Sequence, residues 1–208
     1  LSKNPLESSN ILGELFTAIS QRQTINLHYH TFKNKDGQLA VTLFPYLLKE
    51  YNRRWFLIAA AESDGKLLTF GLDRIDGVEN LPSHKYVDYD GDLNELYEDI
   101  IGVTYKGDSP VYKIMLWVSD NSKDYVVTKP LHESQRSVSE AKAQELYSLF
   151  PTLSGGQFFI IECKENYELI RELTSFGKDL VVLSPKPITD LVERRVLEMF
   201  EIYSKLRT

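Results

Sequence analysis

The sequence predicts an α+β protein, in which a small five-stranded β-barrel precedes a ferredoxin-like β-α-β-β-α-β domain that ends in a long helix. Three features of the 208 residues support this fold class. Apolar residues in the first part alternate with a period of two, and tight turns separate the short runs. After Pro110 the predicted strands alternate with helices. The last stretch has apolar residues at helical spacing.

These features divide the chain into four segments. We expect a linker helix in residues 1–22, the barrel in 23–86, an acidic connector in 87–109 and the second domain in 110–208. In the linker, residues 10–22 have helical spacing of apolar side chains. Ser9 or Asn10 can cap the start of that helix.

Five short strands are expected in the barrel segment. Their approximate ranges are 24–30, 38–44, 54–61, 67–72 and 77–81. Turns are predicted at Asn34–Gly37 and Ser63–Lys66, and Pro45 should end or bend the second strand. No room is left between these strands for helices, so a parallel, doubly wound sheet is excluded. A small, strongly bent barrel satisfies this pattern.

Charge is distributed unevenly along a chain whose net charge is −6. Residues 22–86 contain nine Lys and Arg against seven Asp and Glu, whereas residues 87–109 contain one Lys against seven acidic residues. The acidity therefore lies mainly in the connector, where a short helix is expected at 93–101. The barrel segment is mildly basic, which permits a local anion site, but the whole chain is no general nucleic-acid binder.

The second domain should contain four strands and two helices. The strands are expected at 111–118, 131–138, 157–163 and 180–184, and the helices at 119–129 and 166–176. Asn166 is a natural N-cap and Gly177 a C-terminal stop. Residues 139–156 form a helical insertion.

The final helix has a continuous apolar stripe, and Pro187 suits its first turn. The stripe consists of Ile188, Leu191, Val192, Val196, Met199, Phe200 and Tyr203. Such a stripe must be buried against the second domain or against another chain, and we predict a homodimer.

Several classes of protein find little support in the residues. No apolar run reaches the ~20 residues of a membrane span. Cys163 is the single cysteine, which excludes an internal disulfide and fits the cytoplasm, the predicted location. His28 and His30 could share one face of a strand as metal ligands do, but no third ligand follows nearby. His132, Glu133 and Ser134 are too close along one strand to converge as a catalytic triad. We therefore expect no enzyme, metal or cofactor.

Short motifs carry a resemblance to a known family. In the first half they are Ile25…Tyr29, Pro45…Leu48, Trp55-Phe56-Leu57 and Leu72-Asp73-Arg74-Ile75. In the second half they are Pro130-Leu131-His132-Glu133-Ser134-Gln135, Asn166-Tyr167-Glu168-Leu169, Ser175-Phe176-Gly177 and Val182-Leu183-Ser184-Pro185. In order and spacing, over residues 10–205, they resemble the WYL-domain transcriptional regulators of bacteria and the extension that often follows the WYL domain. Phe56 occupies the tyrosine position.

The resemblance implies an Sm-like barrel with a basic groove that binds nucleotides or nucleic acid. Arg54 and Arg74 match the basic positions, and Tyr29 and Trp55 are the candidate aromatic contacts. The family usually has further arginines before the Asp-Arg-Ile triplet. Here those positions hold Leu68 or Thr69, and Gly71.

Most members carry a winged helix-turn-helix before the barrel. None is evident here, and the chain begins at Leu1, so we expect that a DNA-binding domain is missing upstream. Duplex DNA would then be bound only through that domain.

Three hypotheses about function follow. In the first, the chain is the ligand-sensing and dimerisation part of a regulator, and a nucleotide or single-stranded nucleic acid binds the barrel. In the second, the chain is only an assembly module. In that case Asp73 and Arg74 form a structural ion pair, and Trp55-Phe56-Leu57 is a core strand. The third hypothesis, a hydrolase or metalloenzyme, has the least support.

Overall fold

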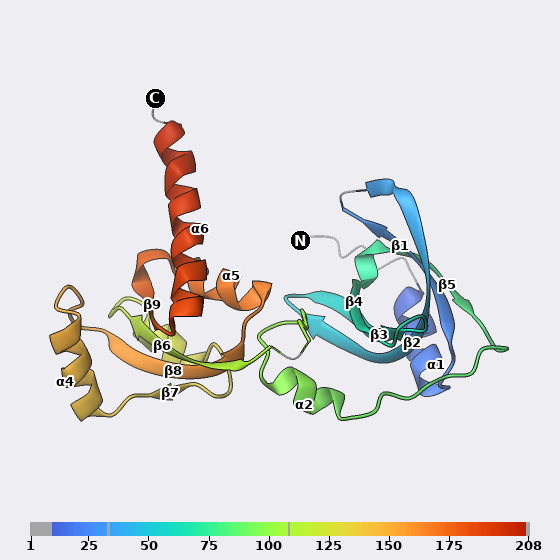
Figure 1. The fold of residues 1–208 in the computed structure, drawn as a ribbon, viewed down its shortest axis with the longest axis horizontal. Helices are drawn as coiled ribbons and strands as arrows, with labels where there is room; N and C mark the ends of the chain where they lie inside the picture. Colours follow the sequence, from blue (N-terminus) through green and yellow to red (C-terminus); the bar gives the residue numbers. More distant parts are fainter. Residues whose placement is uncertain (1–9, 33, 108, 207–208) are drawn as a thin grey trace. The chain divides into compact units, whose positions relative to one another are not determined.

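The computed structural model describes residues 10–32, 34–107 and 109–206 and divides the chain into two compact units, Leu1–Tyr97 and Glu98–Thr208 (Figure 1). Each unit has its own antiparallel sheet, of five strands in the first and four in the second. The prediction of a mixed α/β chain with two separate sheets is confirmed. The boundary between the units falls within the predicted connector.

In the first unit, one helix packs on a five-stranded sheet. Its elements are α1 (Ile11–Ser20), β1 (Ile25–Thr31), β2 (Asn34–Tyr51), β3 (Arg54–Ala61), β4 (Leu67–Gly71), the 3₁₀ turn η2 (Leu72–Arg74), β5 (Ile75–Asn80) and α2 (Leu93–Glu98). The strand order is β4-β3-β2-β1-β5. Leu15 of α1 joins Leu27 and Leu57 of the sheet in one core. Alternation along β3 turns Leu57 inward and leaves Arg54 and Phe56 on the other face.

The predicted barrel is wrong in one respect, since the five strands do not close. β4 and β5 lie at opposite ends of the strand order, and no ladder joins them among the described residues. The predicted turn at Asn34–Gly37 is also wrong, because Thr31 already pairs with Asn34. The chain therefore reverses between those two residues.

Pro45 does not end the second strand. β2 extends over 18 residues, and its register with β3 shifts between Pro45 and Leu47. Proline has no N–H to give to a ladder, and a bulge at this point lets the strand bend and continue. The first half of β2 therefore pairs with β1 and the second half with β3.

The fourth strand is shorter than predicted. β4 ends at Gly71, and Leu72, which is 1% exposed, begins the turn η2. Burial of Leu72 fixes this turn, which places Asp73 and Arg74 beside the sheet instead of within it.

The second unit has helices on both faces of its sheet. Its elements are β6 (Val111–Val118), α3 (Lys123–Thr128), β7 (Arg136–Ser137), α4 (Glu140–Leu149), β8 (Gln157–Lys164), α5 (Tyr167–Ser175), the 3₁₀ turn η3 (Gly177–Asp179), β9 (Leu180–Ser184) and α6 (Lys186–Lys205). The strand order is β7-β8-β6-β9. Phe159 and Ile161 of β8 face α5 and α6, whereas Phe158 faces α4. The predicted ferredoxin-like arrangement stays a prediction.

The ends of α5 agree with the sequence signals. Asn166 is the N-cap, and its Oδ1 accepts a hydrogen bond from the Leu169 N–H at 2.8 Å. Gly177, with φ +57°, follows the helix in a conformation that favours glycine.

Three other predictions for the connector and the second unit need correction. The strand predicted at 131–138 is reduced to Arg136–Ser137, because side-chain hydrogen bonds hold the preceding residues in turns. The helix expected at 93–101 ends at Glu98, and the helix expected from 119 begins at Lys123.

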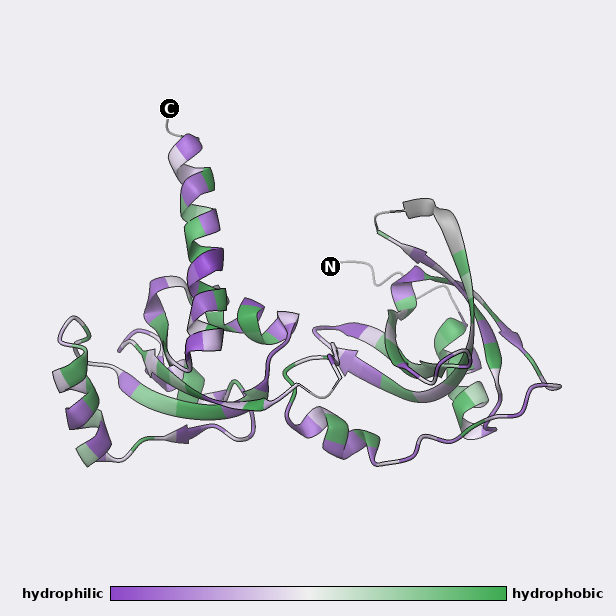
Figure 2. Ribbon diagram, viewed as in Figure 1, coloured by the Kyte–Doolittle hydropathy of each residue, from purple (hydrophilic) through white to green (hydrophobic). Residues whose placement is uncertain are grey.

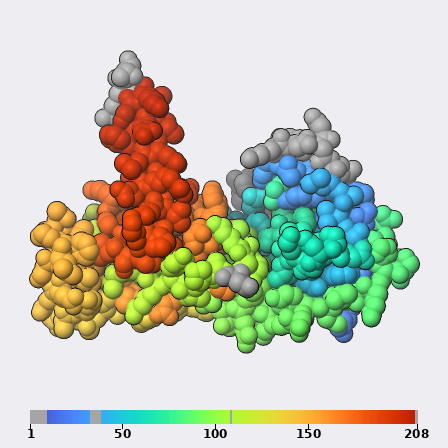
Figure 3. Space-filling model, viewed as in Figure 1, coloured from blue at the N-terminus to red at the C-terminus, as the bar shows by residue number. Residues whose placement is uncertain are grey.

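Only the first turns of α6 dock on their own domain. Ile188 is fully buried, and Leu191 and Val192 pack against the same core. Beyond them α6 stands out from its unit, as the red helix of Figure 3 shows, and Figure 2 shows hydrophobic residues along this free part. The exposed apolar residues of this part are Val196, Leu197, Met199, Phe200, Ile202 and Tyr203, and Leu206 follows directly after the helix. No helix within the described residues is both long enough and apolar enough to cross a membrane.

Candidate functional site

Two arginines of the first unit meet beside one carboxylate. Arg54 is the first residue of β3, and Arg74 is the last residue of η2. Arg54 Nη2 forms an ion pair with Asp73 Oδ2, and the Arg54 side chain remains 44% exposed. The chain thus places two positive charges and one negative charge at one end of the sheet.

Aromatic rings surround the two guanidinium groups. The Arg74 guanidinium carbon lies 4.9 Å from the ring centroid of Tyr29 and 4.7 Å from that of Phe32. The Arg54 guanidinium carbon lies 5.9 Å from the ring centroid of Phe32 and 5.9 Å from that of Phe56. All four distances fall in the range where a cation is attracted to the face of a ring. We call Tyr29, Phe32, Arg54, Asp73 and Arg74 the arginine site.

The structure brings together three of the four residues that the sequence suggested. Tyr29, Arg54 and Arg74 belong to the arginine site, whereas Trp55 packs against the core of the first unit. The two-residue period of a strand explains this, since Trp55 and Arg54 must face opposite sides. That any of them contacts a ligand stays a prediction.

Sequence reasoning missed Phe32 and Asp73 as parts of this site, and Phe56 as a neighbour of Arg54. Phe56 could have been found, because it lies two residues after Arg54 on the same face of β3. Asp73 was considered only as a neighbour of Arg74, although its ion pair is with Arg54. No local signal identifies Phe32, whose position depends on where the β1–β2 hairpin turns.

Two buried polar atoms of the site have no hydrogen-bond partner among the described residues. They are Arg74 Nε and Asp73 Oδ1. Gly71 lies against both side chains, because a Cβ at this position would be 2.7 Å from Asp73 Oδ1 and 3.3 Å from Arg74 Nη2. A larger residue at 71 would displace them. Glycine here therefore leaves room for this arrangement of Asp73 and Arg74.

Tyr29 supplies a neutral ring to the site. Burial raises the pKa of its phenol, while the charge of Arg74 and a hydrogen bond with the Gly71 backbone act in the opposite direction. The ring is 6% exposed and contacts Phe70 edge-on at 5.1 Å. The Tyr29 ring therefore packs against the Arg74 guanidinium and has little surface left for a ligand.

Of the two histidines on β1, His30 contacts the site, since its ring stacks on that of Tyr29 with 6.5 Å between the centroids. His30 Nδ1 lies 2.9 Å from Asp76 Oδ1, an exposed contact between β1 and β5. Within the described residues, no group of three or more His, Cys, Asp or Glu side chains could hold a metal ion.

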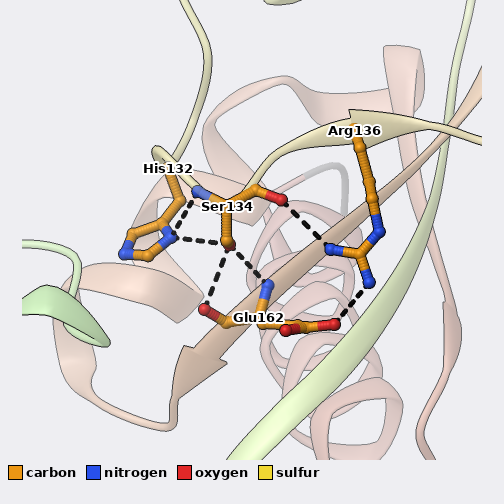
Figure 4. A network of polar contacts seen from close by, with 4 residues as sticks. All are labelled: His132, Ser134, Arg136 and Glu162. Atoms are coloured by element: carbon orange, nitrogen blue, oxygen red, sulfur yellow. Dashed lines mark hydrogen bonds and ion pairs between the residues drawn. The ribbon is translucent and has the colours of Figure 1, made fainter.

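A second polar cluster lies in the second unit (Figure 4). His132 and Ser134 do approach each other, because residues 131–135 form turns: Ser134 Oγ lies 2.7 Å from His132 Nδ1. His132 Nε2 lies 2.6 Å from the Glu98 carbonyl oxygen. A carbonyl oxygen only accepts, so Nε2 carries the proton and Nδ1 accepts.

Backbone groups of β8 also hold Ser134. Its Oγ accepts the Glu162 N–H at 2.8 Å and lies 3.2 Å from the Glu162 carbonyl oxygen. Arg136 joins the cluster through an ion pair with the Glu162 carboxylate. These bonds attach the turn to the sheet. We call these four residues the serine cluster.

Comparison with known proteins agrees with the motifs. The WYL domain model matches residues 10–80, and the WCX domain model matches residues 110–200. No curated protein matches the chain. A solved structure of a CRISPR Cas-related protein is similar with a TM-score of 0.51 and 15% identity, over 94% of this chain and 52% of that one. Proteasome accessory factor B/C (PafBC) of Arthrobacter aurescens gives a TM-score of 0.38 and 16% identity, over 91% of this chain and 26% of that one.

This chain therefore spans about half of the first of these proteins and about a quarter of the second. At such identities the likeness to the CRISPR Cas-related protein concerns the fold alone. The two domain matches occur in the order and at the positions of the sequence motifs. The chain belongs to the WYL-domain family, and a WCX domain follows its WYL domain.

Proposed function

We propose that this chain is the sensing part of a transcriptional regulator, and that its WYL domain binds a nucleotide or single-stranded nucleic acid at the arginine site. The observation that carries the proposal is the convergence of Arg54 and Arg74 on one aromatic ring, that of Phe32. Guanidinium groups bind phosphate through paired hydrogen bonds, and aromatic rings stack on bases. Binding, without turnover, is the proposed activity, and the proposed location is the cytoplasm.

Asp73 gives the site a means of responding to its ligand. It pairs with Arg54 in the structure, so an incoming phosphate competes with the Asp73 carboxylate for that guanidinium. Asp73 lies in η2, directly before β5. Release of this ion pair would favour a different position of the turn, which is how a ligand shifts an equilibrium between conformations.

Output to DNA would require a domain outside this chain. With a net charge of −6, the chain itself should bind duplex DNA weakly. Ligand binding would instead alter the relation between two copies, and so the spacing of their DNA-reading domains.

The test is binding of a fluorescein-labelled ten-nucleotide oligo-dT, followed by anisotropy at 50 mM salt. The double variant Arg54→Ala/Arg74→Ala should bind at least tenfold more weakly than the wild type. The variant Arg194→Ala/Arg195→Ala removes the same charge from α6 and should bind like the wild type. Equal affinity of the wild type and the first variant would refute the arginine site.

A pure assembly module is the second candidate function, and one observation favours it. Six apolar residues in the free part of α6 are at least half exposed, and a second copy of α6 would cover them. Sedimentation equilibrium should give a dimer for the wild type and a 24.0 kDa monomer for Phe200→Glu. A dimer that binds neither nucleotides nor oligonucleotides would make this the better description.

A further inference from the structure

We infer that Phe32 holds the base of the ligand, so that the site recognises a phosphate joined to a flat heteroaromatic ring and discriminates against a phosphate alone. This inference rests on the proposed function and names the chemistry of its ligand.

Phe32 is the most exposed aromatic residue of the arginine site. It is 62% exposed, although the guanidinium groups of Arg74 and Arg54 lie 4.7 and 5.9 Å from its ring centroid. A ring covered on both faces could not retain that much exposure. Much of the Phe32 side chain is therefore open to solvent beside the two arginines.

The other aromatic residues nearby have no comparable free surface. Tyr29 is buried beneath Arg74 and contacts Phe70. Trp55 packs into the core of the WYL domain. Phe56 is half-buried beside Arg54. A ligand ring that approaches the two arginines therefore meets Phe32 first.

The chemistry of the ring and its neighbours fits a nucleotide unit. An exposed phenylalanine gains from being covered by a flat apolar surface, and any base can provide one. The two cations lie within 6 Å of the same ring centroid. One sugar separates the base of a nucleotide from its phosphate, so a single unit can stack on Phe32 while its phosphate reaches Arg54 or Arg74.

Two matched pairs of ligands isolate the contribution of the base. Adenosine 5′-monophosphate is compared with ribose 5-phosphate by calorimetry, and oligo-dT is compared with an abasic strand of equal length. The first pair tests a free nucleotide, and the second tests a nucleic-acid strand. The affinity of each of the four ligands is measured for the wild type, Phe32→Leu and Phe32→Trp. The control is Phe200→Leu, which alters a phenylalanine that is 67% exposed on α6.

The wild type should prefer the base-bearing member of at least one pair by about 5- to 100-fold, the range typical of base stacking on an aromatic side chain. Phe32→Leu should reduce that preference to less than threefold, without weakening the base-free member. Phe32→Trp should keep or increase it, and Phe200→Leu should leave it unchanged. Leucine retains an apolar side chain, and circular dichroism will show that the variant is folded.

Three negative results are possible, and each leads to a different conclusion. A preference that survives in Phe32→Leu overturns the role of Phe32 and leaves the proposed function standing. Equal binding of both members by the wild type shows a phosphate site without base recognition, and also refutes the inference. No binding of any of the four ligands overturns the proposed function itself, and the inference with it.

Discussion

The arginine site of the WYL domain and the serine cluster of the WCX domain use similar residues in opposite ways. In the serine cluster, the Ser134 hydroxyl and the Arg136 guanidinium are satisfied by the domain itself. In the arginine site, Arg74 Nε and Asp73 Oδ1 are buried without a hydrogen-bond partner among the described residues. The first arrangement pairs its polar groups within the fold, whereas the second leaves two of them unpaired within the residues that the structure describes.

The energetic reason is the cost of an unmade hydrogen bond. A buried polar group without a partner costs about 1–3 kcal/mol, and native proteins keep few of them. A few other such atoms occur in the described part of the chain, for example Glu168 Oε2 in the WCX domain. At the arginine site two of them belong to adjacent residues of opposite charge, next to an exposed arginine.

The largest expected difference between the two regions is in binding. Arg74→Ala should weaken binding of labelled oligo-dT by about 10- to 100-fold, because it removes a charge-assisted contact worth about 1–3 kcal/mol. Its free energy of unfolding should fall by less than about 1 kcal/mol, as for a cation–π contact. Arg136→Ala is the matched control and should not affect binding in anisotropy titrations. If Arg74→Ala unfolds the WYL domain and leaves binding unaltered, the residue is structural.

The second-largest expected effect is on the stability of the WCX domain. Ser134→Ala should lower the free energy of unfolding of the WCX domain by about 1–3 kcal/mol, because the Glu162 N–H loses its acceptor. Trp117 in β6 reports on this domain, so urea unfolding is followed by fluorescence in a Trp55→Phe background. Ser137→Ala, on an exposed part of β7, should cost less than about 0.5 kcal/mol. An equal cost for both variants would contradict a special role for Ser134.

Removing the Asp73 carboxylate, which competes with a ligand for Arg54, should change the binding affinity by a smaller factor. Asp73→Asn frees Arg54 from its ion pair, so affinity for oligo-dT should rise about two- to fivefold, in line with the strength of a half-exposed pair. The gain should be greater at 50 than at 200 mM salt, because salt screens exposed charges. Glu162→Gln is the control in the serine cluster and should produce no gain. Weaker binding by Asp73→Asn would mean that Asp73 positions Arg54 for the ligand.

The last prediction concerns the reactivity of the Cys163 thiol in the core of the WCX domain, where we expect the smallest effect. Burial raises the pKa of the Cys163 thiol to about 12, and the nearby Asp99 and Glu162 act in the same direction. The thiolate is the reactive form, so the native protein should not react with a disulfide reagent at pH 8 within minutes. One thiol per chain should react after denaturation. Rapid reaction of the native protein would show that this core opens, unlike the closed region inferred here.

Regular elements with strong local patterns were predicted closely. The boundaries of β3 and β6 agree with the apolar runs, and α5 begins after Asn166 as the cap signal indicated. Predictions failed where side chains compete with backbone pairing. Residues 131–135 have the composition of a strand end, but His132 and Ser134 bond to backbone groups far along the chain. Gln135 bonds to the Val126 carbonyl oxygen.

The sequence by itself determined the two-domain α/β order, the family motifs and the basic character of the WYL segment, because these depend on local periodicity, on capping residues and on composition. It also identified Tyr29, Arg54 and Arg74, through their motif positions. Only the tertiary structure decided that Phe32 joins them and that Trp55 does not. The reason is that strand register and the location of a hairpin turn fix which side chains share a face, and both are set by pairing between distant residues.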